Sequence, residues 1–316
     1  MPEHASVKQE SIGEKSKTVL ERYESRVTNN RGNGFSTPLR YPGGKGRLGP
    51  WLSRVMRHNR MSGGCYVEPY AGGGGVATYL LTRGYVDHIM INDLDPAIHA
   101  FWWSVLHDTD AFVELVRRTP VTIESWERQK AVHGKLQDHS TTEVGFATFF
   151  LNRTNRSGIL TGGVIGGKKQ LGNFSIDARF NKTDLIDRIR EIASLKRHIS
   201  LFCEDAVELI VGLKGELSGR SLIYLDPPYF HKGKQLYRKY YKPKDHDVIR
   251  TTIGQIDTPW IMTYDNCPEI RNLYDVCQSA EFSMRYSVSG KRTAGSEILF
   301  YGNLVLPELP TLSKSG

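Results

Sequence analysis

The feature that most constrains the fold is a short apolar run that meets a glycine-rich loop. Residues 65–68 (CYVE) precede the loop 69–75 (PYAGGGG), and an apolar segment typical of a helix follows the glycines. A second apolar run, 88–91, ends at Asn92-Asp93, and a helical pattern begins near Pro96. Strand, loop and helix therefore alternate, which predicts an α/β chain.

The later apolar runs extend this pattern. Residues 199–202, 221–225 and 260–264 each end in a polar residue or proline, as the strands of a buried parallel sheet do. Near the end, 281–288 and 297–301 flank the basic segment 289–295. They predict a terminal antiparallel hairpin with a long basic tip.

Changes in the hydrophobic pattern along the chain predict its domain organisation. Helical periodicity over residues 108–195, interrupted by a glycine-rich stretch at 157–173, indicates an insertion. We expect a polar N-terminal tail with a short helix at 16–27, an α/β domain and a C-terminal tail. The predicted boundaries are 1–34 for the first tail, 35–107 and 196–306 for the α/β domain, 108–195 for the insertion, and 307–316 for the last tail.

Charge and cysteine usage narrow the class of protein. The chain has 42 basic and 34 acidic residues, a net charge of +8 that favours polyanionic partners such as nucleic acid or acidic lipid. Its four cysteines form no CxxC pair, which argues against a zinc site and indicates reduced thiols. Because no apolar run approaches the roughly 20 residues of a membrane span, and no apolar signal core begins the chain, we expect a cytoplasmic protein.

The glycine loop has the spacing of a nucleoside site. Gly72, Gly74 and Ala77 follow a strand and open a helix, and Asp93 ends the next strand. Glycines let the backbone approach a ligand, and an acid at the second strand accepts hydrogen bonds from ribose hydroxyls. NAD and S-adenosylmethionine both carry that ribose, and a tight turn without a ligand is the structural alternative.

A first loop, RYPGGK at 40–45, adds an aromatic ring and a cation. The sulfonium of S-adenosylmethionine is attracted to an aromatic face such as Tyr41, and its carboxylate to an ammonium such as Lys45. A solvated lysine in a glycine turn is the simpler interpretation of this loop alone.

The run 221–225 ends in Asp226-Pro227-Pro228-Tyr229. This DPPY motif, taken with 40–45, 68–75 and Asn92-Asp93 in the same order, resembles the D12, or Dam-like, family of adenine-N6 DNA methyltransferases over roughly residues 38–302. The resemblance implies a Rossmann-like class I methyltransferase sheet dependent on S-adenosylmethionine, with an inserted, mainly helical target-recognition domain. It also implies a site-specific enzyme that methylates adenine N6 in duplex DNA.

The chemistry explains the motif. An exocyclic adenine amine shares its lone pair with the ring, so the Asp226 carboxylate and the Pro227 carbonyl would accept its hydrogens and aim the lone pair at the methyl group. Pro227 and Pro228 stiffen the turn, and Tyr229 would stack on the base. For the motif in isolation, a rigid turn that ends a strand is the alternative.

The resemblance implies which residues hold the cofactor. Asp205 follows the strand before DPPY, where a surface carboxylate at a strand end is the alternative. The full predicted set is Tyr41, Lys45, Glu68, Pro69, Ala71, Gly72, Gly74, Asp93, Asp205 and Asp226.

The target base must leave the duplex, so basic residues are expected around the pocket. Candidates lie in the acid-free segment after DPPY, in the insertion and in the terminal hairpin, although solvated lysines and ordinary turns also have this composition. Residues 159–171 are richer in glycine than the family's hairpin, so the GATC target is not carried over. The predicted DNA contacts are Asn152, Arg153, Asn155, Arg156, Lys168, Lys169, Lys232, Lys234, Arg238, Lys239, Lys291 and Arg292.

Alternative functions follow from the same residues. The tetrad would activate any flat conjugated amine, so methylation of adenine in RNA is one alternative, and a catalytically silent DNA-binding relative is another. An NAD oxidoreductase explains the glycine loop but not DPPY. For the leading hypothesis we expect a monomer without membrane contacts, whose partners are duplex DNA and cognate restriction or defence-system components.

Overall fold

The computed structural model describes residues 37–40, 45–231, 241–288 and 291–310, and within 284–288 and 291–295 it describes the backbone alone. Several predictions lie outside the described residues: the helix at 16–27 and the sites Tyr41, Lys232, Lys234, Arg238 and Lys239. Among the described residues, no helix is long and apolar enough to cross a membrane.

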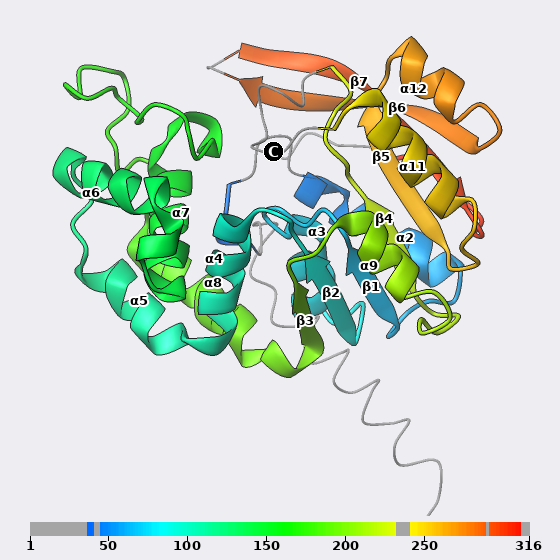
Figure 1. Ribbon diagram of the computed structural model, residues 1–316, viewed down its shortest axis with the longest axis horizontal. Helices are drawn as coiled ribbons and strands as arrows, with labels where there is room; N and C mark the ends of the chain where they lie inside the picture. The colour runs from blue at the N-terminus through cyan, green and yellow to red at the C-terminus, as the bar shows by residue number, and fades with distance from the viewer. Residues whose placement is uncertain (1–36, 41–44, 232–240, 289–290, 311–316) are drawn as a thin grey trace, which may run out of the picture.

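The described residues form a mixed sheet of seven strands in the order β3-β2-β1-β4-β5-β7-β6 (Figure 1). Strands β1 to β5 are parallel, whereas β7 is antiparallel to both β5 and β6. The predicted Rossmann-like sheet with a terminal antiparallel hairpin is confirmed. The strands are β1 (Cys65–Glu68), β2 (His88–Asn92), β3 (Ile199–Phe202), β4 (Leu222–Leu225), β5 (Trp260–Asp265), β6 (Gln278–Val288) and β7 (Lys291–Gly302).

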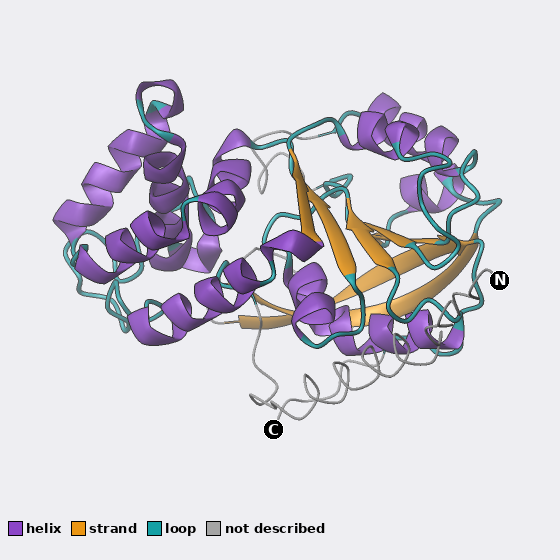
Figure 2. Ribbon diagram, turned by 90° about the horizontal axis from the view of Figure 1, so that it is seen from below, coloured by secondary structure: helices purple, strands orange, loops and turns teal. Residues whose placement is uncertain are grey.

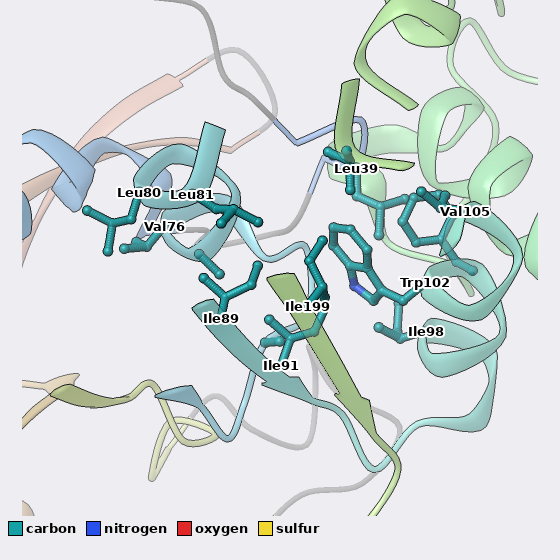
Figure 3. Packing of buried hydrophobic residues seen from close by; sticks show 14 of the residues in the cluster. Leu39, Val76, Leu80, Leu81, Ile89, Ile91, Ile98, Trp102, Val105 and Ile199 are labelled. Carbon is teal, nitrogen blue, oxygen red and sulfur yellow. The ribbon is translucent and has the colours of Figure 1, made fainter. Parts of the chain in front are cut away.

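Helices cover both faces of the sheet, as the continuous apolar runs require. In β4, Leu222 and Tyr224 belong to one buried cluster, and Ile223 and Leu225 belong to the other. Figure 3 shows part of the first cluster, with Trp102 and Val105 packed near Leu39. The first cluster includes η1 (Lys45–Leu48), α2 (Gly49–His58), α3 (Gly75–Thr82) and α4 (Pro96–His107); the second includes α9 (Ala206–Gly212), α11 (Pro243–Ile253) and α12 (Pro268–Leu273).

The predicted insertion is mainly helical, and its helices gather beside the β3 edge of the sheet (Figures 1 and 2). Stacked and edge-on phenylalanine rings, including Phe112, Phe149 and Phe180, join them to Phe101 of α4. The domain boundaries themselves stay a prediction. The elements are α5 (Thr109–Arg118), α6 (Ile123–Gly134), η2 (Leu136–Asp138), α7 (Thr141–Thr154), η3 (Arg156–Gly158), α8 (Lys182–Ser194) and η4 (Lys196–His198).

The terminal hairpin differs from the prediction at its tip. Residues 291–295 belong to β7 and pair with β6 in a register that runs from Val288 opposite Lys291 to Met284 opposite Gly295. The predicted long basic tip over 289–295 is therefore wrong. Glycine, lysine and threonine predict a loop locally, but the cross-strand ladder extends through them. Lys291 and Arg292 thus lie in a strand that extends past the parallel strands, towards the helical region (Figure 1).

Candidate active site

The predicted motifs meet at the carboxyl ends of the parallel strands. Glu68 ends β1, Asp93 follows β2, and Asp226 follows β4. The strand order reverses between β1 and β4, which is where ligands bind in open α/β sheets. Lys45, from the first loop, lies 3.5 Å from the Asp226 carboxylate, measured from Nζ to Oδ1. Two motifs that are distant in the sequence therefore share one site.

The DPPY segment is held from β5 and β7. Thr263 Oγ1 donates to Asp226 Oδ1 at 2.9 Å, and the Phe230 amide donates to Asp265 Oδ1 at 3.1 Å. The Tyr229 hydroxyl donates to Glu297 Oε1 at 2.6 Å. Sequence reasoning missed Thr263, Asp265 and Glu297, although polar residues within apolar strand runs were the available signal.

Lys45 contacts both ends of the tetrad, Asp226 and Tyr229. Its ammonium donates to the Tyr229 hydroxyl at 2.8 Å and lies 3.0 Å from Glu297 Oε2. The side chains of Lys45 and Glu297 are each 2% exposed, whereas that of Asp226 is 19% exposed. The Lys45 ammonium contacts the tetrad through Asp226 and Tyr229, and its predicted contact with the cofactor's carboxylate stays a prediction. The accessible group of this cluster is Asp226.

The electrostatics of the cluster follow from burial. Burial raises the pKa of Asp226, and the nearby Lys45 ammonium and the Thr263 hydroxyl oppose that rise. Burial also raises the pKa of Glu297, where Lys45 again acts in the opposite direction and the Asp226 charge adds to the rise. The Lys45 ammonium thus interacts with two carboxylates, those of Asp226 and Glu297, in a poorly solvated site.

The glycine loop is shaped by its neighbours. Gly72 and Gly74 have φ of +47° and +54°, which glycine adopts most readily. The Gly72 amide donates to Asp93 Oδ2 at 2.9 Å, and Trp102 Nε1 donates to the Gly72 carbonyl at 3.0 Å. Burial raises the pKa of Asp93 to about 7. Asp93 therefore supports the loop as well as ending the second strand.

Asn92 joins the ends of three strands. Its amide nitrogen donates to the Pro69 carbonyl at 2.9 Å and to the Glu204 carbonyl at 3.0 Å, and its side-chain oxygen accepts from the Glu204 amide. The Ala71 amide donates to the Asn92 carbonyl at 2.8 Å. Asn92 was not in the predicted cofactor set, but it holds Pro69 and Ala71, which were.

Three further residues, Asp205, Tyr70 and Tyr241, lie near these strand ends. Asp205 caps α9, where its Oδ1 accepts from the amides of Val207 and Glu208. This capping role is local, and cofactor contact by Asp205 stays a prediction. The hydroxyl oxygens of Tyr70 and Tyr241 lie 3.1 Å apart, so the start of the glycine loop is joined to the chain that follows the DPPY segment.

Two predicted DNA contacts are buried. The Asn152 amide bonds both backbone groups of Arg40 and the carbonyl of Gly158. The Asn155 amide accepts from Trp126 Nε1 and donates to the carbonyls at 159 and 160. These side chains bind the protein's own backbone and Trp126, so we do not retain them as base contacts.

The basic candidates in the insertion are placed differently. Arg153 donates to the carbonyls of Arg179 and Pro38, and burial lowers its pKa to about 9. Arg156 and Lys169 are exposed. Lys168 is also exposed and pairs with Glu127 at 3.0 Å. Arg156, Lys168 and Lys169 are therefore accessible to a polyanion. Arg153 is half-buried and bonds two backbone carbonyls, and its DNA contact stays a prediction.

The Rossmann-like sheet, with a glycine loop after β1, an acid after β2 and a DPPY segment after β4, has the arrangement of a methyltransferase fold. The model of the D12 class N6 adenine-specific DNA methyltransferase family matches residues 41–292, so the chain belongs to that family and is a DNA methyltransferase. It is similar to the Type II methyltransferase M.MjaIII of Methanocaldococcus jannaschii, with 24% identity over 207 residues that cover 60% of this chain and 68% of the relative.

Two solved structures show lower similarity. A proposed RNA methyltransferase from Pyrococcus horikoshii is 10% identical with a TM-score of 0.40, over 90% of this chain and all of that one. An S-adenosylmethionine-dependent methyltransferase from Agrobacterium tumefaciens is 12% identical with a TM-score of 0.37, over 81% of this chain and 62% of that one. The family assignment rests on the family match and not on these structures.

Proposed function

We propose that this protein transfers the methyl group of S-adenosylmethionine to the N6 amine of adenine in duplex DNA, at a specific sequence. The family supports the reaction. The observation that carries the proposal is the placement of Asp226, which is partly exposed at the end of β4, accepts a hydrogen bond from Thr263 and lies 3.5 Å from Lys45.

The residues at the ends of β1 and β2 fit the cofactor. Glu68 is buried, and among the described residues its Oε2 has no hydrogen-bond partner. This oxygen could therefore accept a hydrogen bond from a donor group of the ligand. Position 74 has no room for a side chain, since a Cβ there would lie 2.7 Å from Trp102 Cζ2. Glu68, Asp93 and the backbone of the glycine loop would hold the nucleoside and amino-acid parts.

When bound, S-adenosylmethionine supplies an electrophilic methyl group on a positively charged sulfur. The protein's task is to present the amine. The Asp226 carboxylate and the Pro227 carbonyl accept the two N–H groups, which draws the lone pair out of conjugation with the purine ring. Tyr229, whose hydroxyl is fixed by Glu297, places its ring beside the base. Orientation of the amine is the main contribution to the rate.

The DNA is reached by base flipping, because the amine is paired inside the duplex. The exposed Arg156, Lys168 and Lys169 would contact phosphates and neutralise their charge. We propose the same phosphate contacts for the basic segment at 232–239 and for the hairpin residues Lys291 and Arg292. A restriction enzyme of the same specificity is the partner that this activity predicts, and a monomer suffices because one strand is modified at a time.

Methylation assays with matched polymers test the proposal. The protein is incubated with isotopically labelled S-adenosylmethionine and adenine-unmethylated genomic duplex DNA or RNA, and modified adenines are detected by mass spectrometry and mapped by sequencing. We expect N6-methyladenine in duplex DNA at one sequence. Labelling of RNA alone, or of another base, would overturn the proposal.

A substitution tests the assigned residue. Asp226→Ala is expected to lower kcat by about 1,000-fold, because the main amine acceptor is lost, while calorimetry shows cofactor binding within about twofold of wild type. Asp247→Ala, which removes an exposed aspartate on α11, is the matched control and retains activity. Turnover by Asp226→Ala at the wild-type rate would contradict the role.

A further inference from the structure

Glu297 is a buried carboxylate that none of the sequence motifs includes. It lies on β7, opposite Asp265 of β5 in the antiparallel register. Its two oxygens contact different members of the site: Oε1 accepts from the Tyr229 hydroxyl at 2.6 Å, and Oε2 lies 3.0 Å from Lys45 Nζ. The side chain is 2% exposed, so its surroundings are protein rather than water.

Glu297 competes with Asp226 for one ammonium. Lys45 Nζ is closer to Glu297 Oε2, at 3.0 Å, than to Asp226 Oδ1, at 3.5 Å. In a poorly solvated site, a lysine that loses one carboxylate partner moves towards the other, because an unpaired buried charge is costly. Removing the Glu297 charge would therefore bring Lys45 onto Asp226.

We propose that Glu297 is a positioning residue that holds the Lys45 ammonium away from Asp226 and thereby leaves the Asp226 carboxylate free to accept the hydrogens of the substrate amine. The inference rests on the function proposed above. A carboxylate that is fully engaged by a lysine is a weaker acceptor for a new donor, so the position of Lys45 controls how well the amine is held. Through Oε1, Glu297 also fixes the hydroxyl end of Tyr229.

Several groups surround Asp226 and set its titration. They are Lys45 from η1, Glu297 from β7 and Thr263 from β5, together with the buried acid Glu68 of β1 and the phenols of Tyr66 and Tyr224. Loss of the Glu297 charge removes a repulsion and brings the ammonium closer. Both effects lower the pKa of Asp226.

The test uses Glu297→Gln in the full-length protein, since glutamine keeps the shape and an oxygen for Tyr229 but loses the charge. We expect kcat on duplex DNA to fall by about 100-fold, as for a misplaced catalytic group, with the cofactor dissociation constant within about twofold of wild type. The acid limb of the kcat profile moves to lower pH. Glu281→Gln, on the neighbouring strand and exposed beside Arg271, is the matched control and leaves kcat and the profile unchanged.

A double-mutant cycle tests whether Glu297 acts through Lys45. In the Lys45→Met background, adding Glu297→Gln should change kcat by less than about twofold, because the ammonium is already absent. Multiplicative losses, an unchanged acid limb in Glu297→Gln, or wild-type kcat in that variant would overturn the proposal. Should Glu297→Gln not fold, Glu297→Asp keeps the charge, and its acid limb must stay at the wild-type position.

A structural measurement separates this inference from the proposed function. In a crystal structure of Glu297→Gln, Lys45 Nζ should lie within hydrogen-bond distance of Asp226 Oδ1, closer than 3.5 Å. An unmoved Lys45 would overturn the inference even in an active enzyme. If the wild-type protein methylates no duplex DNA, the proposed function fails, and the position of Lys45 in the variant still tests the positioning claim.

Discussion

The hydroxyl oxygen of Thr263 lies 2.9 Å from Asp226 Oδ1 and 2.9 Å from the hydroxyl oxygen of Tyr224. Because a threonine has one hydroxyl hydrogen and donates it to the carboxylate, Tyr224 must be the donor to Thr263. A chain of two hydrogen bonds therefore runs from a buried phenol on β4, through β5, to the acceptor of the substrate amine.

Removal of this support should slow the reaction without loss of cofactor. Thr263→Val keeps the volume but leaves Asp226 with one bond fewer, so we expect kcat to fall by about 10-fold, which corresponds to the roughly 1.5 kcal/mol of a hydrogen bond to a charged group. The Thr263 hydroxyl lowers the pKa of Asp226, so the acid limb of kcat moves to higher pH.

Thr252→Val is the control, because Thr252 is also buried and its hydroxyl bonds the carbonyl of Val248 within α11. Its kcat and pH profile should match wild type. An acid limb at lower pH in Thr263→Val, the direction expected for Glu297→Gln, would contradict the hydrogen-bond assignment.

Asp93 should make the stability of the ligand-free protein depend on pH. Burial raises its pKa from 3.8 to about 7, so the folded chain binds this proton more tightly than the unfolded chain. Its contribution to the free energy of unfolding is then fully present below about pH 4 and is lost as the pH rises to about 7, by up to about 4 kcal/mol. Denaturant unfolding between pH 4.5 and 8 measures this loss.

In Asp93→Asn the dependence should be smaller, because the side chain no longer ionises, and the variant should be more stable than wild type at pH 8. Its affinity for the cofactor should fall. Asp247→Asn, at an exposed aspartate, should keep the wild-type pH dependence. Equal slopes for Asp93→Asn and wild type would count against the assignment.

Substitution of Asn152 should affect stability, whereas substitution of Arg156 should affect DNA binding. Asn152→Ala removes three hydrogen bonds to backbone groups and is expected to lower the free energy of unfolding by about 3 kcal/mol. Arg156→Ala should change stability by less than about 0.5 kcal/mol but lower DNA affinity and reduce the salt slope by about one.

Thermal unfolding and salt-dependent DNA titrations measure both effects. If Asn152→Ala were as stable as wild type but bound DNA weakly, the original interpretation of this asparagine as a DNA contact would regain support.

Gly74 should not tolerate a side chain. An alanine there combines a φ of +54° with a Cβ 2.7 Å from Trp102, so Gly74→Ala should lower the free energy of unfolding by about 2 kcal/mol or more. It should also weaken cofactor binding by at least about 10-fold. At Gly134 a Cβ would meet nothing within 4 Å, so Gly134→Ala is the control and should be neutral. Calorimetry with and without cofactor measures both quantities, and wild-type binding by Gly74→Ala would refute the constraint.

The sequence predicted the parallel sheet well because buried strands are nearly continuous apolar runs bounded by polar residues. The runs 199–202 and 260–264 became β3 and β5 almost without change. The hairpin tip was predicted poorly, since residues 291–295 have loop-forming composition and are strand only through their pairing with β6. Local composition cannot report a cross-strand partner.

The sequence predicted only those residues of the candidate site that belong to a recognisable motif. Asp226 and Asp93 were found because a strand and a turn mark them. Glu297 and Thr263 were not predicted, because no motif contains them. Their contacts with Tyr229 and Asp226 depend on the packing and register of β5 and β7. Asparagine is a residue type typical of DNA contacts, and only the structure shows that the Asn152 side chain is buried and bonds backbone groups.

The late position of β7 has a consequence for biosynthesis. The ribosome makes Lys45, the glycine loop and Asp226 well before residue 297, so a nascent chain contains the Asp226 partner of Lys45 before it contains Glu297. Pairing of β7 with β5 supplies the competing acid. Under the role proposed for Glu297, a newly made molecule completes its site when β7 emerges and pairs with β5, and not when the DPPY segment is made.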